Sequence, residues 1–266
     1  MITLKKLYLG AILFFMYAPI LLLVVFSFNA STSRNVWGGF TLQWYAQLFR
    51  DHNIMRALRN TLIVAVLSTI ISVIIGTLAA VSVDKLGKRK KRAIMAVSKL
   101  PVMMPDIVTG LTLMILFLFV FRTIGAGRLG LGTLLLAHII FNVPYVILSV
   151  LPRLRQLDPN LYEAALDLGS GPFRAFVQVI LPEIWPGVVT GAMLAFTLSV
   201  DDFMVSFFTT GPGAQNLSIL IFSMTRRGID PRINALSTLI LIVITTMLFL
   251  INRRDKSLIR RQKENE

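Results

Sequence analysis

Three acidic residues stand inside long apolar runs, where a charged side chain is costly. Asp106 lies early in one run, and Asp201 and Asp202 lie late in another. A carboxylate at the centre of a membrane span costs about 2.5–3.5 kcal/mol on insertion scales, so it needs a partner or a water-filled path. No Lys or Arg occurs in the apolar runs of this chain. The counter-charge must come from a partner subunit, from water and protons, or from a cationic substrate, and we favour the substrate.

Polar residues accompany the pair of acids. On a continuous helix Asp201 and Asp202 point about 100° apart, so both can border one cavity if it is wide. Ser199 and Ser206 fall on the face of Asp202, three residues before it and four after it. The two serines therefore share one helix face with Asp202.

The sequence offers little for catalysis. Cysteine is absent and there are two histidines, His52 and His138, so a metal site rich in thiolate or imidazole is excluded. A rhomboid-like protease needs a G-x-S-x-G serine, and ATP binding by a phosphate loop needs G-x-x-x-x-G-K-[ST]; neither motif occurs. We interpret His138 and Asn142 as helix–helix hydrogen-bonding residues. We expect no catalytic residue, no metal and no cofactor in this chain.

The composition predicts an all-α membrane protein with six transmembrane helices. Of the 266 residues, 55% are hydrophobic, which is too many for an ordinary soluble domain. Six apolar runs reach the roughly 20 residues that cross a bilayer core: Leu7–Phe28, Thr61–Val83, Val102–Phe121, Leu131–Leu151, Ile184–Phe208 and Ala235–Ile251. The first run shows no A-x-A cleavage pattern, so we expect a retained anchor rather than a signal peptide.

The distribution of basic residues predicts the orientation. The net charge of +14 would suit a nucleic-acid partner, but in a membrane protein it indicates basic cytoplasmic loops, and we expect no nucleic acid. With the N-terminus inside, 18 of the 27 Lys and Arg residues lie in inner segments. Both termini are therefore predicted to be cytoplasmic. The basic run Lys88–Arg92 is interpreted as an anchor on the lipid of the inner leaflet.

Two further patterns concern packing. In the outer loop from Asn29 to Asn60, Thr41 is predicted to cap a short amphipathic helix. One side of this helix carries Leu42, Tyr45, Leu48 and Phe49, with Trp44 beside them, and we expect it to lie at the membrane surface. In the fifth run, Gly187, Gly191 and Ala195 recur every four residues. Such a ridge of small residues lets another helix approach closely.

One polar stretch interrupts the second half of the chain. From Asp158 to Pro182, Asp158 is predicted to cap a helix that begins at Pro159, and Gly169 to end it in the left-handed conformation. A second short helix is predicted to begin at Pro172. The charge count places this helix–Gly–helix stretch inside the cell.

The same stretch resembles a family motif. EAA at 163–165, three residues, Gly169, nine residues and then Val179-Ile180-Leu181-Pro182 resembles the EAA motif of ABC importer permeases, whose consensus has Ile where Val179 stands. Three segments, MPDIVTG (104–110), SVDDFMVSFFTTGPG (199–213) and INALST (233–238), look like PotC-type permeases of spermidine/putrescine importers.

The resemblance implies a type I ABC importer (MetI-like) permease fold, as a single permease domain over 1–266 with a cytoplasmic coupling segment at 158–182. It implies ATPase coupling through Glu163, Ala164, Ala165 and Gly169. It implies a polyamine path that includes Trp44, Asp106, Ser199, Asp201 and Asp202. The implied partners are a second, PotB-like permease, two ATPase subunits that carry ATP and Mg, and a periplasmic or lipid-anchored substrate-binding protein.

Three other functions fit parts of the pattern. An ABC permease for iron, thiamine or an anionic ligand is one, although the acids disfavour oxyanions. A proton-coupled carrier that uses Asp106, Asp201 and Asp202 as relays is the second, although we find no inverted repeat. A structural or assembly membrane protein is the third.

Overall fold

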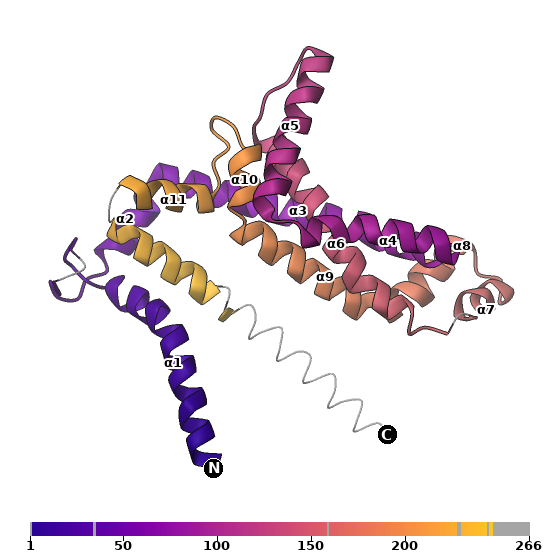
Figure 1. Ribbon diagram of the computed structural model, residues 1–266, viewed down its shortest axis with the longest axis horizontal. Coiled ribbons are helices and arrows are strands. Elements are labelled where there is room, and N and C mark those ends of the chain that lie inside the picture. Colours follow the sequence, from indigo (N-terminus) through magenta and orange to yellow (C-terminus); the bar gives the residue numbers. More distant parts are fainter. Residues whose placement is uncertain (1, 34–35, 159, 228–229, 244, 247–266) are drawn as a thin grey trace. The chain divides into compact units, whose positions relative to one another are not determined.

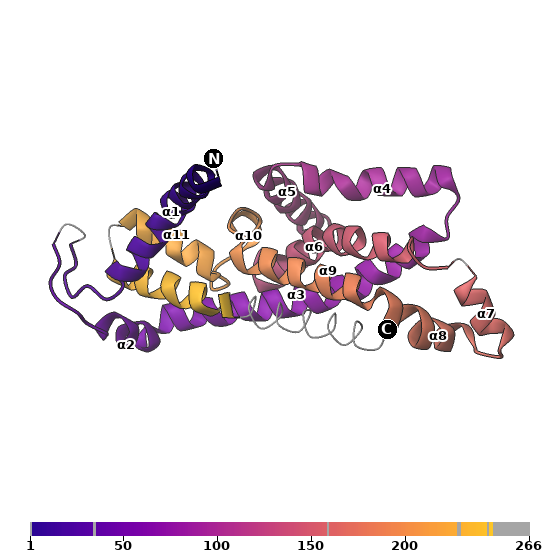
Figure 2. The ribbon, with the colours of Figure 1, turned by 90° about the horizontal axis from the view of Figure 1, so that it is seen from below.

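The computed structural model describes residues 2–33, 36–158, 160–227, 230–243 and 245–246. The chain forms two compact units, the first from residues 1–55 and 221–266 and the second from residues 56–220. Helices dominate both units (Figures 1 and 2).

The second unit contains most of the helices. Their bounds are α3 His52–Asp84 (whose first turn falls in the first unit), α4 Lys88–Met103, α5 Asp106–Ile124, α6 Leu131–Leu154, α7 Leu161–Asp167, α8 Pro172–Ala175, the π-helical turn η1 Phe176–Ile180, α9 Leu181–Asp201 and α10 Met204–Thr209. The first unit holds α1 Ile2–Phe26, α2 Gln43–Arg50, most of α11 Leu217–Arg227, and the apolar helix Pro231–Val243.

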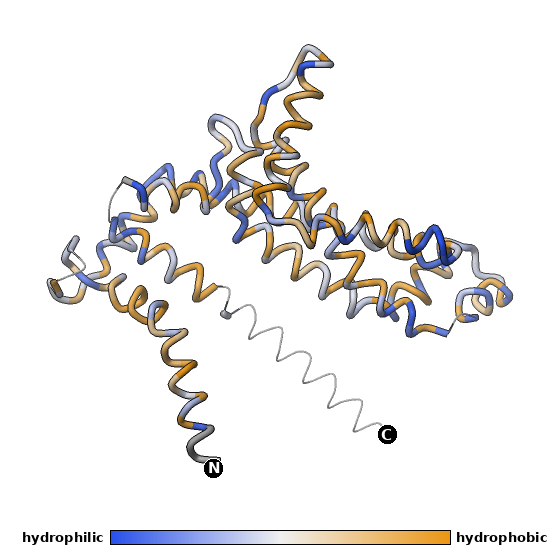
Figure 3. The backbone as a smooth tube through the Cα atoms, in the orientation of Figure 1, coloured by the Kyte–Doolittle hydropathy of each residue, from blue (hydrophilic) through white to orange (hydrophobic). Residues whose placement is uncertain are grey.

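Five helices among the described residues are long and apolar enough to cross a membrane. They coincide with the first five predicted spans, and Figure 3 shows their predominantly hydrophobic colour. The predicted sixth span, Ala235–Ile251, begins within the helix Pro231–Val243, and most of its remainder lies outside the described residues.

Two predicted span boundaries were wrong. The third span was predicted from Val102, but α4 ends at Met103 and the spanning helix begins at Asp106, directly after Pro105. Proline disfavours the helical conformation of the residue before it, which explains the interruption. The fifth span was predicted to run unbroken to Phe208, but the helix ends at Asp201 and a new one begins at Met204.

The core of the second unit forms where α3, α6 and α9 meet. α6 and α9 run side by side (Figures 1 and 2). Val146 of α6 is fully buried between two glycines. A Cβ atom on Gly76 would lie 2.7 Å from the Val146 side chain, and one on Gly191 would lie 3.2 Å from the Val146 Cα. The predicted small-residue ridge is therefore confirmed, because its glycines admit α6.

The first unit is organised by Asn29. Its side-chain amide donates to the Val36 carbonyl at 2.9 Å, and its side-chain oxygen accepts from Gly38 N–H at 2.8 Å. Its backbone carbonyl accepts the indole N–H of Trp44 at 2.7 Å. One asparagine thus holds the loop before α2 and fixes α2 itself.

The same unit contains a charged cluster on Arg232. This guanidinium donates to Asp51 at 2.8 Å and to Asp230 at 2.6 Å. Burial alone would raise the pKa of Asp230, but the hydrogen bonds and charge of Arg232 outweigh it and hold that pKa below its usual range. Arg232 therefore joins the start of the helix Pro231–Val243 to the end of α2.

The close approach of α6 and α9 gives a first prediction. Gly191→Leu places a bulky side chain against the Val146 backbone, so we expect the free energy of unfolding to fall by about 1–3 kcal/mol. Thr190→Leu is the matched control, because Thr190 is exposed on the same helix. The melting temperature of the detergent-purified protein measures the difference. Equal stability of the two variants would contradict the tight α6–α9 contact.

Candidate functional site

The candidate site centres on the break between α9 and α10. The amide of Asp202 still donates to the Leu198 carbonyl at 3.0 Å, but its own backbone is extended, with ψ of 126°. The α9 helix therefore stops between the two adjacent acids. Asp201 is the last helical residue and is exposed, whereas the Asp202 side chain is 6% exposed.

The carboxylate of Asp202 begins the next helix. One oxygen, Oδ1, accepts from Val205 N–H at 3.2 Å, and the other, Oδ2, accepts from Ser206 N–H at 2.7 Å. These are N–H groups of the first turn of α10, which have no partner within the helix. A negative charge at a helix N-terminus is also favoured by the helix dipole. Asp202 therefore acts as a cap that stabilises the break.

A buried network surrounds this cap. His138 of α6 lies with its Nε2 3.0 Å from Ser206 Oγ and 3.6 Å from Asp202 Oδ2. Asn216, which precedes α11, donates to Ser206 Oγ at 2.7 Å and to the Asp202 carbonyl at 3.3 Å. The break is thus held by side chains from two other segments as well as by its own cap.

A second network lies one helical turn earlier in α9. The hydroxyl of Ser199 lies 3.0 Å from that of Ser68 in α3 and accepts from the Asn142 amide in α6 at 2.7 Å. All three side chains are buried, with Ser199 1% exposed. The structure therefore places Ser199 in the joint between α3, α6 and α9. The prediction that His138 and Asn142 make hydrogen bonds between helices is confirmed.

A close contact brings Asp106 towards the same region. A Cβ atom on Gly110 of α5 would lie 3.0 Å from the Met204 carbonyl oxygen and 3.1 Å from the Val205 Cα, at the start of α10. Asp106 lies one turn before Gly110 on the same face of α5. The structure thus brings Asp106 into the neighbourhood of the break that carries Asp201.

Asp106 and Asp201 share an electrostatic feature. Both are exposed, and neither carboxylate makes a hydrogen bond or an ion pair within the described part of the chain. Other acids have partners of their own: Asp202 accepts from the start of α10, Asp84 pairs with Lys91, and Asp51 pairs with Arg232. Asp106 and Asp201 are therefore free to attract a cation.

Trp44 lies in the first unit, whereas the acids lie in the second. Its side chain is 8% exposed and is held by the hydrogen bond to Asn29. The predicted face of α2 was partly wrong, because Leu42 and Phe49 are exposed while Trp44 and Leu48 are buried. The buried pair, spaced four residues apart, is the face that packs.

The predicted coupling segment forms the turn that its sequence indicates. Gly169 has φ of +83°, and its amide donates to the Leu166 carbonyl at 2.9 Å, while the Ser170 amide donates to the Ala165 carbonyl at 3.1 Å. These two bonds are those of a Schellman motif, in which glycine is preferred. The helix α7 begins at Leu161 rather than at the predicted Pro159, which is not among the described residues. Asp158 instead accepts from Asn160 N–H at 2.9 Å.

Two large apolar side chains flank the turn and face outward. Leu168 is 88% exposed and Phe173 is 81% exposed. Glu163 and Ala164 are exposed and Ala165 is buried. Glu163 also borders a cavity of about 840 Å³ between the end of α3, α7 and η1. The turn therefore presents an apolar surface with nothing of its own unit covering it.

The predicted coupling segment and Asp201 are joined by a continuous helix. From Pro172 through η1 and α9 the chain is helical to Asp201, over 30 residues. At 1.5 Å per residue this is about 45 Å. The exposed turn therefore lies directly before one end of this helix, and the break lies at the other end.

Sequence reasoning missed Ser68 and Asn216. Asn216 accepts from Ile219 N–H at 3.0 Å and so caps α11, a helix that was not predicted. Its signal was a capping residue directly before an apolar run. Ser68 has no local signal, because its role depends on the meeting of three helices.

The comparisons with known proteins agree with this architecture. A crystal structure of a bacterial ABC transporter involved in the import of the acidic polysaccharide alginate has a chain with a TM-score of 0.70 and 18% identity, over 94% of this chain and 93% of that one. The fold is accordingly that of an ABC transporter permease of the MetI-like type.

Sequence comparison defines the family. Residues 72–263 match the model of the binding-protein-dependent transport system inner membrane component, and the chain belongs to this family. The putrescine transport system permease PotI of Escherichia coli K12 is 42% identical over 92% of this chain and 90% of its own length. The spermidine/putrescine transport system permease PotC of the same organism is 37% identical over 90% and 89%. The chain is therefore a multi-pass inner-membrane permease component and not an enzyme.

The cap at the break gives a second prediction. Asp202→Asn leaves one acceptor oxygen for two N–H groups and turns an amide NH₂ towards them, so we expect a loss of about 1–3 kcal/mol in stability. Asp201→Asn should leave stability unchanged, because Asp201 is exposed and unpaired in the described structure. Thermal unfolding of both purified variants measures this. A melting temperature lowered equally in both would show that Asp202 has no special capping role.

Proposed function

We propose that this chain is the permease subunit of an ATP-driven importer of polyamines. The observation that carries the proposal is the pair of exposed, unpaired carboxylates, Asp106 and Asp201, near the break between α9 and α10. A di- or tri-cation is attracted by separated carboxylates in a channel without a fixed counter-charge. The relatives PotI and PotC are named for the transport of putrescine and of spermidine/putrescine, which supports this chemistry.

In this proposal the predicted path residues have different roles. Asp201 and Asp106 attract the ammonium groups of the substrate. Asp202 caps the helix break, and Ser199 joins α9 to α3 and α6 from inside the protein. Trp44 fixes the outer segment before α3. Its ring is buried and its indole N–H donates to the Asn29 carbonyl, so its contribution to the path is indirect.

The partners follow from the family and from the exposed turn. An importer of this kind needs a substrate-binding protein, which the family description includes. We propose a second, PotB-like permease and two ATPase subunits that carry ATP and Mg. The segment 158–182, with Glu163, Ala164, Ala165 and Gly169, would seat Leu168 and Phe173 on an ATPase. With this segment on the cytoplasmic side, both termini also lie in the cytoplasm, as the excess of Lys and Arg in the inner segments favours.

The proposed mechanism is mechanical. Closure of the ATPase dimer around ATP moves the turn at Gly169, and the helix that begins at Pro172 transmits that movement to Asp201. The break then changes its position relative to α5, to which α10 is packed at Gly110. Such rigid-body movement of a helix about a discrete joint is a known way to switch access.

The substrate assignment gives a third prediction. In membrane vesicles that contain the whole importer and its binding protein, Asp201→Asn and Asp106→Asn should lower uptake of labelled putrescine and spermidine by about tenfold or more. Each removes an attraction of about 1–4 kcal/mol to a nearby ammonium group. Glu183→Gln is the control, because Glu183 is an exposed acid at the start of α9, outside both the path and the segment 158–182.

Full uptake in both path variants would contradict the cationic path. Uptake that persists when the ATPase subunits are inactivated would instead support the proton-coupled carrier. Uptake of a different small substrate, without uptake of putrescine or spermidine, would support an importer but contradict the polyamine assignment.

The exposed turn gives a fourth prediction. The double substitution Leu168→Ser, Phe173→Ser should reduce the amount of ATPase that co-purifies with the permease by about tenfold or more, because exposed apolar anchors dominate interfaces. Gln178→Ser, an exposed polar residue of the same segment, should have no effect. The amount of permease in the membrane should be the same in both. Unchanged ATPase recovery in the double variant would show that this surface is not the docking site.

A further inference from the structure

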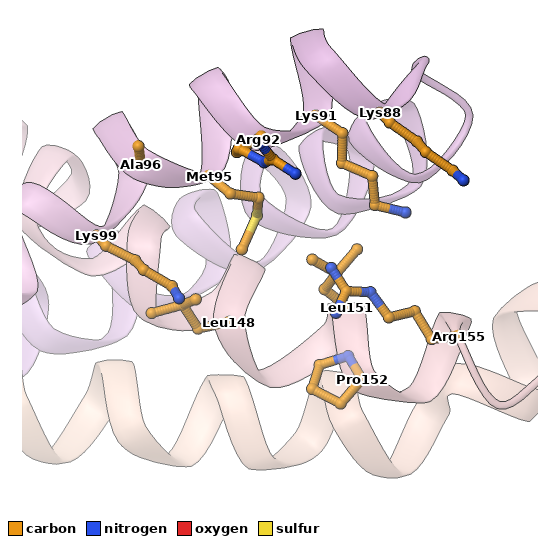
Figure 4. A pocket seen from close by; sticks show the side chains of 10 residues that line it. All are labelled: Lys88, Lys91, Arg92, Met95, Ala96, Lys99, Leu148, Leu151, Pro152 and Arg155. Carbon is orange, nitrogen blue, oxygen red and sulfur yellow. The ribbon is translucent and has the colours of Figure 1, made fainter.

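A groove between α4 and α6 is lined by basic side chains. It has a volume of about 620 Å³ and lies within the second unit. Its basic lining residues are Lys88, Lys91, Arg92 and Lys99 of α4 and Arg155, directly after α6. Figure 4 shows these α4 side chains directed towards α6, with Arg155 reaching up from the other side. Cations from two separate elements therefore converge on one space.

The floor of the groove is apolar. It consists of Met95 and Ala96 of α4 with Leu148, Leu151 and Pro152 of α6. Away from the groove, the later part of α4 exposes Val97 (66%) and Leu100 (54%). The groove itself thus offers a cationic entrance and an apolar floor.

The cations of the groove are largely uncompensated. Lys91 is bound to Asp84 at 2.6 Å. Within the described part of the chain, the other four form no ion pair. Facing positive charges repel one another across a weakly polar space, so this arrangement is stabilised when an anion enters. A ligand that complements both the cations and the apolar floor is an anion with an apolar part.

We propose that the groove binds the headgroup of an anionic phospholipid, with its phosphate among Lys88, Arg92 and Arg155 and an acyl chain along Met95 and Leu148. Guanidinium groups suit this role, because they bind phosphate oxygens in a bidentate manner. Basic pockets between transmembrane helices on the cytoplasmic side are suited to such headgroups. The cytoplasmic placement rests on the proposed orientation, but the binding site itself is independent of polyamine transport.

A lipid explains the groove better than a free anion does. Inorganic phosphate satisfies the cations but leaves the apolar floor of the groove without a partner. The start of α4 is strongly hydrophilic and its later part apolar, as Figure 3 shows. This order matches the change from headgroup to acyl chain across a membrane interface.

Native mass spectrometry of the purified importer in detergent tests this site. Phosphatidylglycerol should bind more tightly than phosphatidylethanolamine with the same acyl chains. The double variant Arg92→Gln, Arg155→Gln should weaken phosphatidylglycerol binding by about 25-fold, because each cation near an anionic lipid contributes about fivefold. The matched control is Arg89→Gln, Lys90→Gln, which removes the same charge from exposed residues of α4 that do not line the groove. This control should bind the lipid almost normally.

Several results would overturn the proposal. Equal weakening in the two double variants would indicate diffuse surface charge, and equal binding of the two lipids would exclude an anion site. Displacement of the lipid by millimolar inorganic phosphate would assign the groove to a free anion. Arg92→Lys, Arg155→Lys keeps the charge and should retain most of the binding, which separates lipid loss from damage to the complex. Since binding is measured without transport, failure here leaves the polyamine test unaffected.

Discussion

The buried carboxylate of Asp202 is the interaction on which the candidate path depends. It accepts two N–H groups at the start of α10 and lies beside His138, so a charge in a span is satisfied by the protein itself. Because this cap ends one helix and begins another, Asp201 becomes the last residue of α9 and faces outward. The short helix α10 can then pack on α5 at Gly110, near Asp106. The buried Asp202 thus positions the exposed Asp201 and Asp106.

The two ends of the long helix have complementary characters. At one end, Gly169 supplies a left-handed turn that exposes Leu168 and Phe173, a surface suited to a partner. At the other end, Asp201 lies at a joint fixed by hydrogen bonds from α6 and from Asn216. Between them, glycines pack α9 closely against α6, which keeps the connection stiff. This arrangement suits a protein that converts movement at one end into altered access at the other.

Much of this was predictable from the sequence, but the key joint was not. Hydropathy located five spans, and the spacing around Gly169 predicted its turn, since both signals are local. The break at Asp202 was missed because its apolar surroundings predict a continuous helix, and its cap depends on His138 and Asn216, distant in sequence. Trp44 was predicted for the path from a family resemblance, whereas its burial depends on the folding of the loop around Asn29. Tertiary hydrogen bonds, which leave no periodic signal, account for the break and for the burial of Trp44, whose place in the path stays a prediction.

The difference between the two neighbouring acids can be measured directly, because the chain contains no cysteine. In the assembled importer, Asp201→Cys and Asp202→Cys each introduce one thiol that a small cationic thiol reagent can label. We predict that Asp201→Cys is labelled rapidly and is protected by spermidine or putrescine, while Asp202→Cys reacts slowly in either condition. Equal labelling at the two positions, or labelling of Asp201→Cys that the polyamines leave unchanged, would contradict the assignment of one acid to the substrate and the other to the fold.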